Sequence, residues 1–491
     1  MASTTKFFRV LIMVCAIMAS IACWTAQATI PDSDGVEELD VTRSDFPSDF
    51  TFGVATSAAQ TEGSAREGGR GPSTWDHRVD ILPDRVINSD KFSTAIDSYT
   101  RYKEDINIIK HLGVNSYRFS ISWSRLLPKG SLSGGINQEG VDHYNSLIDE
   151  LIRNGIKPFV TILHFDLPQA LEEKYGGYLN RSFVTDFEDY SELCFKLFGD
   201  RVKNWFTINE PTVLAVYGYE VGIAPPGKCS LKEGVCVIGS PENCLVPAGP
   251  CDFGGDSSTE PYIVAHNLIL AHATAVKLYK EKYQVQQKGE IGIVLASKYF
   301  VPLSESQEDK AAAERLFDFN LGWFMEPFIH KTPPPSEKLR YSLDISAEET
   351  CMKDELFLGS NCEGHWPEGL QKLMEYMKEK YQSPKIYVSE NGLYTRRNDS
   401  LPLADQLKDP ERISYLVRHL YRLNKAIKNG VNVKGYFYWA LFDDFEWGMG
   451  FSDRYGLYYI DFDHNNRRIP KLSAKWFKDF LESNIVTRAS S

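Results

Sequence analysis

The sequence lacks a basic stripe: 54 Lys and Arg residues are outnumbered by 66 Asp and Glu residues, and the formal net charge is −12. An acidic chain of this kind argues against nucleic acid as the main partner. Internal repeats, low-complexity tracts and interdomain linkers are also missing, so the 491 residues can form one large domain as readily as two or three smaller ones. The hydrophobic fraction of 43% and the charged fraction of 24% exclude disordered, collagen-like and coiled-coil proteins.

No apolar run beyond the N-terminal one is long enough to span a bilayer. Lys6 and Arg9 precede the run Val10–Trp24, and the small-x-small pattern Ala26-Gln27-Ala28 follows it. This order predicts a secretory signal peptide over residues 1–28, with a retained anchor as the alternative. We expect a flexible segment over residues 29–44, a disordered tail over residues 486–491, and no membrane span in the mature chain.

Two features fit an oxidising compartment. Four of the nine cysteines cluster in one Gly/Pro-rich stretch, which predicts a disulfide-stapled loop with three possible pairings: Cys229, Cys236, Cys244 and Cys251. Zinc is the competing interpretation, but the spacings are long and the next histidine is His266. The sequons at Asn180 and Asn398 are glycosylation candidates. We therefore expect the secretory pathway, with the vacuole, a compartment derived from the endoplasmic reticulum and the extracellular space left open.

Strands alternate with helices along most of the chain, which predicts an α/β protein with a parallel sheet. Seven strands are expected, at residues 50–56, 114–122, 158–164, 202–209, 291–299, 385–390 and 434–441. Eight helices are expected, at about residues 95–111, 138–153, 182–198, 261–283, 309–321, 368–381, 410–429 and 472–481. The rhythm breaks between Ile329 and Trp366, where no convincing strand is found. The pattern predicts a single (β/α)8 TIM barrel over residues 45–485 that lacks or replaces its sixth strand.

Two of the predicted strands end in a glutamate. Glu210 follows Asn209 at the end of the fourth strand. Glu390 ends the strand at residues 385–390, which takes the seventh position in the barrel because the sixth is unaccounted for. Because chemistry in such barrels lies at the carboxyl ends of the strands, both acids should share one rim. An ion pair at the rim is the plain structural explanation, but two acids beside aromatic residues favour paired-carboxylate catalysis. Glycoside hydrolysis needs one protonated and one ionised carboxyl, and the sequence does not say which is which.

Five motifs occur in order over most of the chain, and together they resemble glycoside hydrolase family 1 β-glucosidases of the plant secretory branch. They are Phe50-Thr-Phe-Gly-Val-Ala-Thr-Ser-Ala-Ala-Gln60-Thr-Glu-Gly63, His164-Phe-Asp-Leu-Pro-Gln169, Thr207-Ile-Asn-Glu-Pro211, Ser389-Glu-Asn-Gly392 and Trp439-Ala-Leu-Phe-Asp-Asp-Phe-Glu446-Trp447. The resemblance implies that Glu210 is the general acid/base and Glu390 the nucleophile.

The same resemblance implies a glucose-binding set around the two acids. Asn209 would hold the sugar 2-hydroxyl, and Trp439 would form an aromatic wall. The other residues implied to contact the glucose are Gln60, His164, Glu446, Trp447 and Tyr455, the last standing where Phe is usual. Ordinary core packing is the alternative for the two tryptophans. His164-x-Asp166 has metal-ligand spacing, but no third ligand suggests itself, and we expect neither a metal nor a cofactor.

The implied mechanism is retaining, with a covalent glucosyl-enzyme and carboxyls about 5–5.5 Å apart. The expected partner is a small O-β-glucoside with an aromatic or plant secondary-metabolite aglycone, and no sequence feature fixes the oligomeric state. Myrosinases, relatives in this family, carry glutamine in place of the acid/base, so the glutamate at position 210 disfavours a thioglucosidase. A non-enzymatic sugar-binding protein is a further alternative, against which the retention of both glutamates argues.

The chain departs from the family pattern after Ile329, where a segment with the sixth strand and its Asn-x-Tyr motif is expected. The sequence instead runs directly into His330-Lys-Thr-Pro-Pro-Pro335, as after an internal deletion or alternative splicing. The missing tyrosine would hydrogen-bond the nucleophile, and the missing strand would leave unpaired backbone groups that cost about 1–3 kcal/mol each when buried. A catalytically impaired isoform is therefore the second hypothesis. Asp444 also departs from the family, standing where Asn is usual.

Overall fold

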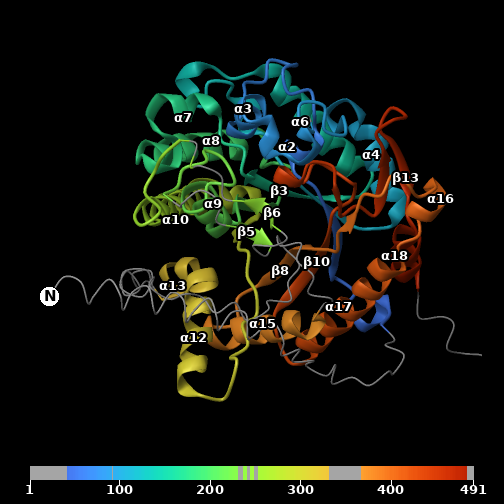
Figure 1. Ribbon diagram of the computed structural model, residues 1–491. Helices are drawn as coiled ribbons and strands as arrows, with labels where there is room; N and C mark the ends of the chain where they lie inside the picture. Colours follow the sequence, from blue (N-terminus) through green and yellow to red (C-terminus); the bar gives the residue numbers. More distant parts are fainter. Residues whose placement is uncertain are drawn as a thin grey trace, which may run out of the picture.

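Seven parallel strands form the central sheet of the computed structural model, and helices surround it (Figure 1). The structure describes residues 41–90, 92–230, 236–239, 244–247, 251, 253–330 and 366–483. Along the sheet the strands run in the order β7 (Glu290–Val294), β4 (Asn204–Asn209), β3 (Lys157–Leu163), β2 (Ser116–Ser120), β1 (Thr51–Ala55), β10 (Val433–Trp439) and β8 (Ile386–Asn391). All six pairings are parallel, and β10 lies beside β1, as in a sheet that curls into a barrel.

The helices expected between the strands are present, because their apolar residues recur at helical spacing and face the sheet. In α6, for example, Val141, Tyr144, Ile148 and Leu151 are buried on one face. The outer helices are α4 (Ser98–Leu112), α6 (Gln138–Arg153), α8 (Ser182–Phe198), α10 (Glu260–Leu278), α12 (Gln307–Phe317), α13 (Trp323–Ile329), α15 (Pro367–Lys380), α17 (Pro410–Lys428) and α18 (Leu472–Glu482). Two single π-turns, Tyr279–Tyr283 and Asp318–Gly322, continue α10 and α12.

Shorter elements occupy the loops that connect the strands and the outer helices. The helices among them are α2 (Ala58–Thr61), α3 (Thr74–Ile81), α5 (Trp123–Leu126), α7 (Gln169–Tyr175), α9 (Pro211–Tyr219), α11 (Gln284–Gln287) and α16 (Leu403–Gln406). Three small antiparallel pairs are formed by β5 (Cys236–Gly239) with β6 (Cys244–Pro247), β9 (Thr395–Arg396) with β11 (Asp453–Arg454), and β12 (Tyr458–Asp461) with β13 (Arg467–Pro470).

Among the described residues, the sheet is not closed between β7 and β8, the fifth and seventh strands of the predicted barrel, and this gap is called the open seam. β7 and β8 are the two edges of the sheet, and no strand of the described residues lies between them. Residues 331–365, in which the sequence analysis found no sixth strand, lie outside the described part of the chain. At the amino ends of the two edge strands, Lys385 Nζ lies 2.5 Å from Glu290 Oε1, so an ion pair spans this seam. Both side chains are about half exposed, and such a pair contributes at most about 1 kcal/mol.

One disulfide staples the loop that follows α9. Cys229 and Cys251 are bonded, which confirms half of the disulfide prediction. The side chains of Cys236 and Cys244 lie outside the described part of the chain, so their pairing stays a prediction. Asn398 is exposed and Asn180 partly exposed, and both amide oxygens accept backbone N–H groups two residues further along. Glycosylation at these positions stays a prediction too.

Residues 1–40, and with them the predicted signal peptide, lie outside the described part of the chain. Among the residues that are described, no helix combines the length and the apolar character needed to cross a bilayer.

Candidate active site

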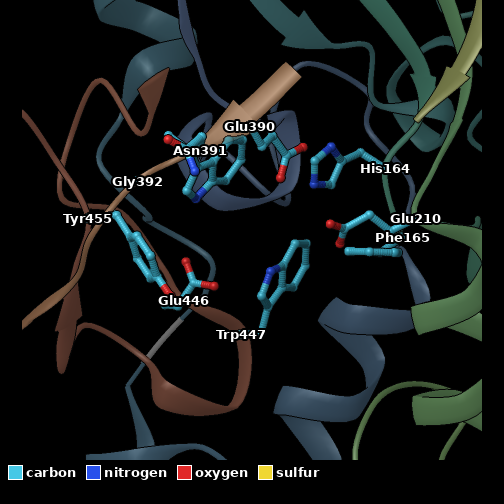
Figure 2. A pocket seen from close by; sticks show the side chains of 10 residues that line it. His164, Phe165, Glu210, Glu390, Asn391, Gly392, Glu446, Trp447 and Tyr455 are labelled. Carbon is cyan, nitrogen blue, oxygen red and sulfur yellow. The ribbon is translucent and has the colours of Figure 1, made fainter. Parts of the chain in front are cut away.

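The two strand-end glutamates face one cavity. Glu210 directly follows β4, and Glu390 lies one residue before the end of β8. The space between the residues that line this cavity is about 470 Å³, a volume that includes its opening to solvent, and Figure 2 shows both carboxylates turned toward its centre from different sides. Its lining comprises His164, Phe165, Glu210, Glu390, Asn391, Gly392, Trp439, Glu446, Trp447 and Tyr455. The fold therefore brings together two acids that are 180 residues apart in the sequence.

The backbone at Glu210 is constrained. Its φ of 39° and ψ of 60° place it in the left-handed region, which is uncommon for a residue with a side chain and is found at functional sites. The Glu210 N–H donates to the carbonyl of Val294 at 3.0 Å, so the last residue of β7 holds this conformation. Pro211 then begins α9. The fourth strand thus ends in a turn that aims the glutamate into the cavity.

Arg118 contacts the carboxylate of Glu390 directly but makes no such contact with Glu210. This fully buried residue of β2 forms an ion pair with the Glu390 carboxylate and donates to the Ser389 carbonyl at 3.1 Å. Its other terminal nitrogen donates to Asn209 Oδ1 at 2.7 Å. Glu210 has no such direct contact with a cation among the described residues. A guanidinium in direct contact stabilises the ionised form of a carboxyl much more than one further away.

The two carboxyl groups therefore differ in protonation. Burial raises the pKa of Glu210 well above its ordinary value, and the negative charge of Glu390 raises it further. Burial also raises the pKa of Glu390, but the charge of Arg118 and its hydrogen bond oppose that effect. The last proton of the pair is consequently held by Glu210, while Glu390 is the first to ionise. This is the separation that an acid and a nucleophile need.

His164 is a neutral hydrogen-bond donor at the cavity wall. Burial and the charge of Arg118 lower the pKa of His164 well below its ordinary value. Because Asn209 Oδ1 accepts from Arg118, its Nδ2 donates to His164 Nε2 at 3.3 Å. A neutral imidazole then carries its proton on Nδ1, and this buried atom has no hydrogen-bond partner in the described structure. The Arg118–Asn209–His164 chain thus leaves the Nδ1–H of His164 without a hydrogen-bond partner among the described residues.

Asn209 and Gln60 lie behind the wall of the cavity and are not part of its lining. Both are fully buried, and Gln60 Nε2 donates to Glu446 Oε2 at 3.2 Å while its Oε1 accepts from Ser57 Oγ. Glu446 does line the cavity, so Gln60 orients a carboxyl group of the site. Direct contact of Asn209 or Gln60 with a sugar stays a prediction.

The tryptophans line the cavity and also pack within it. Trp439 and Trp447 lie nearly parallel to the His164 ring, with centroids at 5.7 and 6.1 Å. Trp447 also contacts Trp75 and Phe165, and Trp439 packs with Tyr455 and Phe437. The two interpretations of these residues are therefore compatible, because one indole can both pack in the core and present a flat surface to the cavity.

Asp444 and Tyr455 have different surroundings. Tyr455 lines the cavity, and its ring lies 5.5 Å from that of Tyr394. Asp444 is 1% exposed, and neither of its carboxylate oxygens has a hydrogen-bond partner among the described residues. Burial and the neighbouring charge of Asp443 raise the pKa of Asp444 well above its ordinary value. Asp444 is therefore a buried acid that holds its proton to a higher pH than an ordinary aspartate does.

The sequence analysis did not identify Arg118, Phe165 and Asn391 as site residues. Phe165 and Asn391 lie inside two of the quoted motifs, next to His164 and Glu390, and that position could have identified them as site residues. Arg118 stands in the middle of the buried strand Ser116–Ser120, where an isolated charge needs a partner. An arginine inside a buried strand was therefore the signal in the sequence. Which acid it pairs with depends on how the sheet curls, and a sequence pattern does not give that curl.

The described residues contain no group of three or more His, Cys, Asp or Glu side chains that could hold a metal ion. His164 and Asp166 are in contact through the His164 backbone, whose N–H donates to Asp166 Oδ1 at 3.3 Å. That hydrogen bond ties the loop after β3 together.

Comparisons with known proteins agree with this geometry. The chain matches the model of Glycosyl hydrolase family 1 over residues 42–355 and 328–486. It is 43% identical to Beta-glucosidase 12 of Oryza sativa subsp. japonica, over 91% of this chain and 94% of the relative, and 42% identical to raucaffricine-O-beta-D-glucosidase of Rauvolfia serpentina, over 94% and 95%. A rice beta-glucosidase mutant solved in a covalent complex with Glc superposes with a TM-score of 0.79 at 37% identity, covering 90% of this chain and 99% of that one.

The comparisons also bear on the predicted absence of the sixth strand. The two stretches matched by the family model overlap over residues 328–355, where the strand–helix rhythm breaks. The alignment with the japonica rice enzyme extends over 497 positions, which exceeds the 491 residues of this chain, so the relative carries residues that this chain lacks. Because the family model matches most of this chain and the relatives are more than 40% identical to it, the chain belongs to glycosyl hydrolase family 1.

Proposed function

We propose that the protein is a retaining β-glucosidase that hydrolyses small O-β-glucosides, with Glu390 as the nucleophile and Glu210 as the general acid/base. The observation that carries this assignment is the placement of Arg118, which contacts Glu390 but not Glu210. It gives one ionised carboxylate and one protonated acid in the same cavity.

The reaction then has two steps. Glu390 attacks the anomeric carbon while Glu210 gives its proton to the leaving oxygen, and a glucosyl ester forms on Glu390. Glu210, now ionised, takes a proton from water, and that water releases glucose from the ester. His164 and Glu446 line the cavity and can bind glucose hydroxyls, and the indole faces of Trp439 and Trp447 can cover the C–H surface of the sugar.

The rest of the cavity and the relatives support an aglycone class. Phe165, which is not among the residues implied to contact glucose, adds an aromatic side chain to the cavity lining and favours flat or hydrophobic aglycones. The curated relatives include a glucosidase named for raucaffricine. We expect O-glucosides of aromatic or plant secondary-metabolite aglycones to be the substrates, and we expect the enzyme to follow the secretory pathway.

A mechanism-based label tests the assignment. A 2-deoxy-2-fluoro-β-glucoside with a dinitrophenolate leaving group should add one fluoroglucosyl mass to the full-length protein, and peptide mapping should locate it on Glu390. Glu390→Gln should not label. Glu210→Gln should still label, because this leaving group needs no proton, yet its kcat/KM on an alkyl glucoside should fall by about 10²- to 10⁴-fold.

A catalytically impaired isoform is the second candidate, and the open seam between β7 and β8 favours it. In the described structure the hydrogen bond to the Glu390 side chain comes from Arg118, and no tyrosine contributes one. A folded protein, shown by a cooperative thermal transition, that never takes up the label would support this second candidate and refute the first.

A further inference from the structure

The end of β8 needs support that its own hydrogen bonding does not provide. Val388 pairs with Tyr436 and Asn391 pairs with Tyr438, so two residues of β8, Ser389 and Glu390, oppose the single residue Phe437 of β10. This is a β-bulge, and it falls on the nucleophile. On its other side β8 has no paired strand among the described residues. Glu390 therefore lies at an interrupted ladder on an edge strand.

Side chains hold this bulge on both of its flanks. Arg118 binds the carbonyl of Ser389, the residue before Glu390. Asn391, the residue after it, is bound at both ends of its amide: its Oδ1 accepts from the Tyr436 hydroxyl at 2.9 Å, and its Nδ2 donates to the Tyr415 hydroxyl at 2.6 Å. With both ends of the amide bound, the side chain of Asn391 is held in one orientation.

The two tyrosines are themselves immobilised. Tyr436 is fully buried in β10, the neighbour of β8, and Tyr415 is 1% exposed in α17. The Tyr415 ring stacks on His419 one turn later, with centroids 3.8 Å apart. The contacts of Asn391 thus tie the end of β8 to a neighbouring strand and to an outer helix. Figure 2 shows Asn391 beside Glu390 at the cavity.

We propose that Asn391, held by Tyr436 and Tyr415, is a positioning residue that fixes the direction of the Glu390 carboxylate. The inference rests on the proposed function, because it assigns a role in forming the glucosyl-enzyme. Asn391 acts through the backbone that it shares with Glu390. It does not touch the carboxylate, so it sets geometry and leaves the ionisation of Glu390 to Arg118 and burial.

The test compares single hydroxyl deletions that keep the aromatic rings. Tyr436→Phe and Tyr415→Phe should each lower the first-order rate constant of labelling by the fluoroglucoside about three- to tenfold, with the concentration for half-maximal labelling unchanged, because a hydrogen bond of ordinary strength is lost from the reacting geometry. The acidic limb of the kcat/KM profile should stay where it is in the wild type. In an Asn391→Ala background, Tyr436→Phe should have a smaller effect than in the wild type, since the hydroxyl then keeps only its 3.4 Å hydrogen bond to the backbone carbonyl of residue 391.

Tyr190→Phe is the matched control. Tyr190 is also fully buried, and its hydroxyl bonds the carbonyls of Ile121 and Ile162, on the far side of β2 and β3 from β8. It should lose a similar amount of thermal stability while its labelling rate stays at the wild-type value.

The outcomes separate the two proposals. If the wild type labels at Glu390 but Tyr436→Phe and Tyr415→Phe label as fast as Tyr190→Phe, the positioning role is refuted and the proposed function stands. If the acidic limb moves in the tyrosine variants, the network acts on charge and the positioning role is refuted as well. A wild type that never labels refutes the proposed function and the positioning role together.

Discussion

Of the residues that the structure describes, Arg118 is the one whose contacts make the two glutamates chemically different. It reaches from β2 to the end of β8 and binds Glu390, and through Asn209 it also sets the tautomer of His164. Removing its charge would leave Glu390 buried without a cation. The role of one arginine therefore extends to the nucleophile and to a sugar-binding donor at once.

Replacing Arg118 by Met should raise the pKa of Glu390, because burial would then act without opposition. The acidic limb of kcat/KM reports ionisation of the nucleophile, so it should move to higher pH, and the maximum should fall by about 10²-fold or more. Arg118→Lys should shift the limb less, since an ammonium keeps the charge but loses the forked contacts. An acidic limb that does not move in Arg118→Met would contradict the assignment of Glu390 as the ionised partner.

Asp444 allows a test of stability against pH. Its pKa is raised in the folded protein, so the folded state holds this proton more tightly than the unfolded chain does. The stabilisation is present at pH values below the ordinary aspartate pKa of about 4 and is lost as pH rises toward and through the raised value. Asp444→Asn should therefore match the wild type in unfolding free energy near pH 4 and exceed it by about 1–3 kcal/mol near pH 7.

Asp443→Asn provides the contrast for that measurement. Asp443 is equally buried, but it is paired with Lys471 at 2.6 Å and with Arg454 at 3.5 Å. Removing its charge leaves buried cations unpaired and should destabilise the protein at pH 7 by about 3–5 kcal/mol. Urea unfolding at several pH values measures both variants. A difference between Asp444→Asn and the wild type that does not grow with pH would show that Asp444 is not a neutral buried acid.

At the scale of single elements, the sequence predicts the bounds of those helices and strands that depend on a local pattern of apolar residues. α6 and α8 have the predicted bounds, because their apolar faces repeat at helical spacing and each ends beside a glycine or asparagine. The strand after α10 was expected over residues 291–299 but ends at Val294. The apolar run continues past that point, yet in the described part of the chain β7 has a paired neighbour on one side only. The chain leaves the sheet after Val294, whose carbonyl accepts the backbone N–H of Glu210.

The element that holds Glu390 shows the limit of such reasoning. The sequence gives a strand ending in an acid, and β8 has nearly the predicted bounds. The bulge that opposes Ser389 and Glu390 to one residue of β10 has no local signature, because it arises from the register between two strands 45 residues apart in the sequence. The position of an active-site residue could be predicted, whereas the support that orients it required the three-dimensional pairing.

For the whole molecule, the open seam determines how stability is distributed. Central strands such as β2 and β3 are paired on both sides, while β7 and β8 each have one paired neighbour among the described residues. β3 is buried over six of its seven residues, but β7 is buried only at Val294. Elements with fewer buried contacts and exposed backbone groups open with lower free energy than the global unfolding. Stability should therefore decrease from the centre of the sheet toward the seam.

Hydrogen exchange followed by mass spectrometry measures this gradient. Peptides from β2 and β3 should exchange only through global unfolding, while peptides from β7 and β8 should exchange at least tenfold faster, corresponding to an opening free energy about 1.4 kcal/mol lower or more. Glu290→Lys replaces the attraction between Glu290 and Lys385 by repulsion between two cations. This substitution should change the exchange rates of β7 and β8 little, because both side chains are half exposed. Equal protection over all seven strands would show that both edges are covered in solution. In that case the open seam could no longer be a reason to expect an impaired enzyme, and the labelling rate of the wild type alone would measure how well Glu390 is oriented.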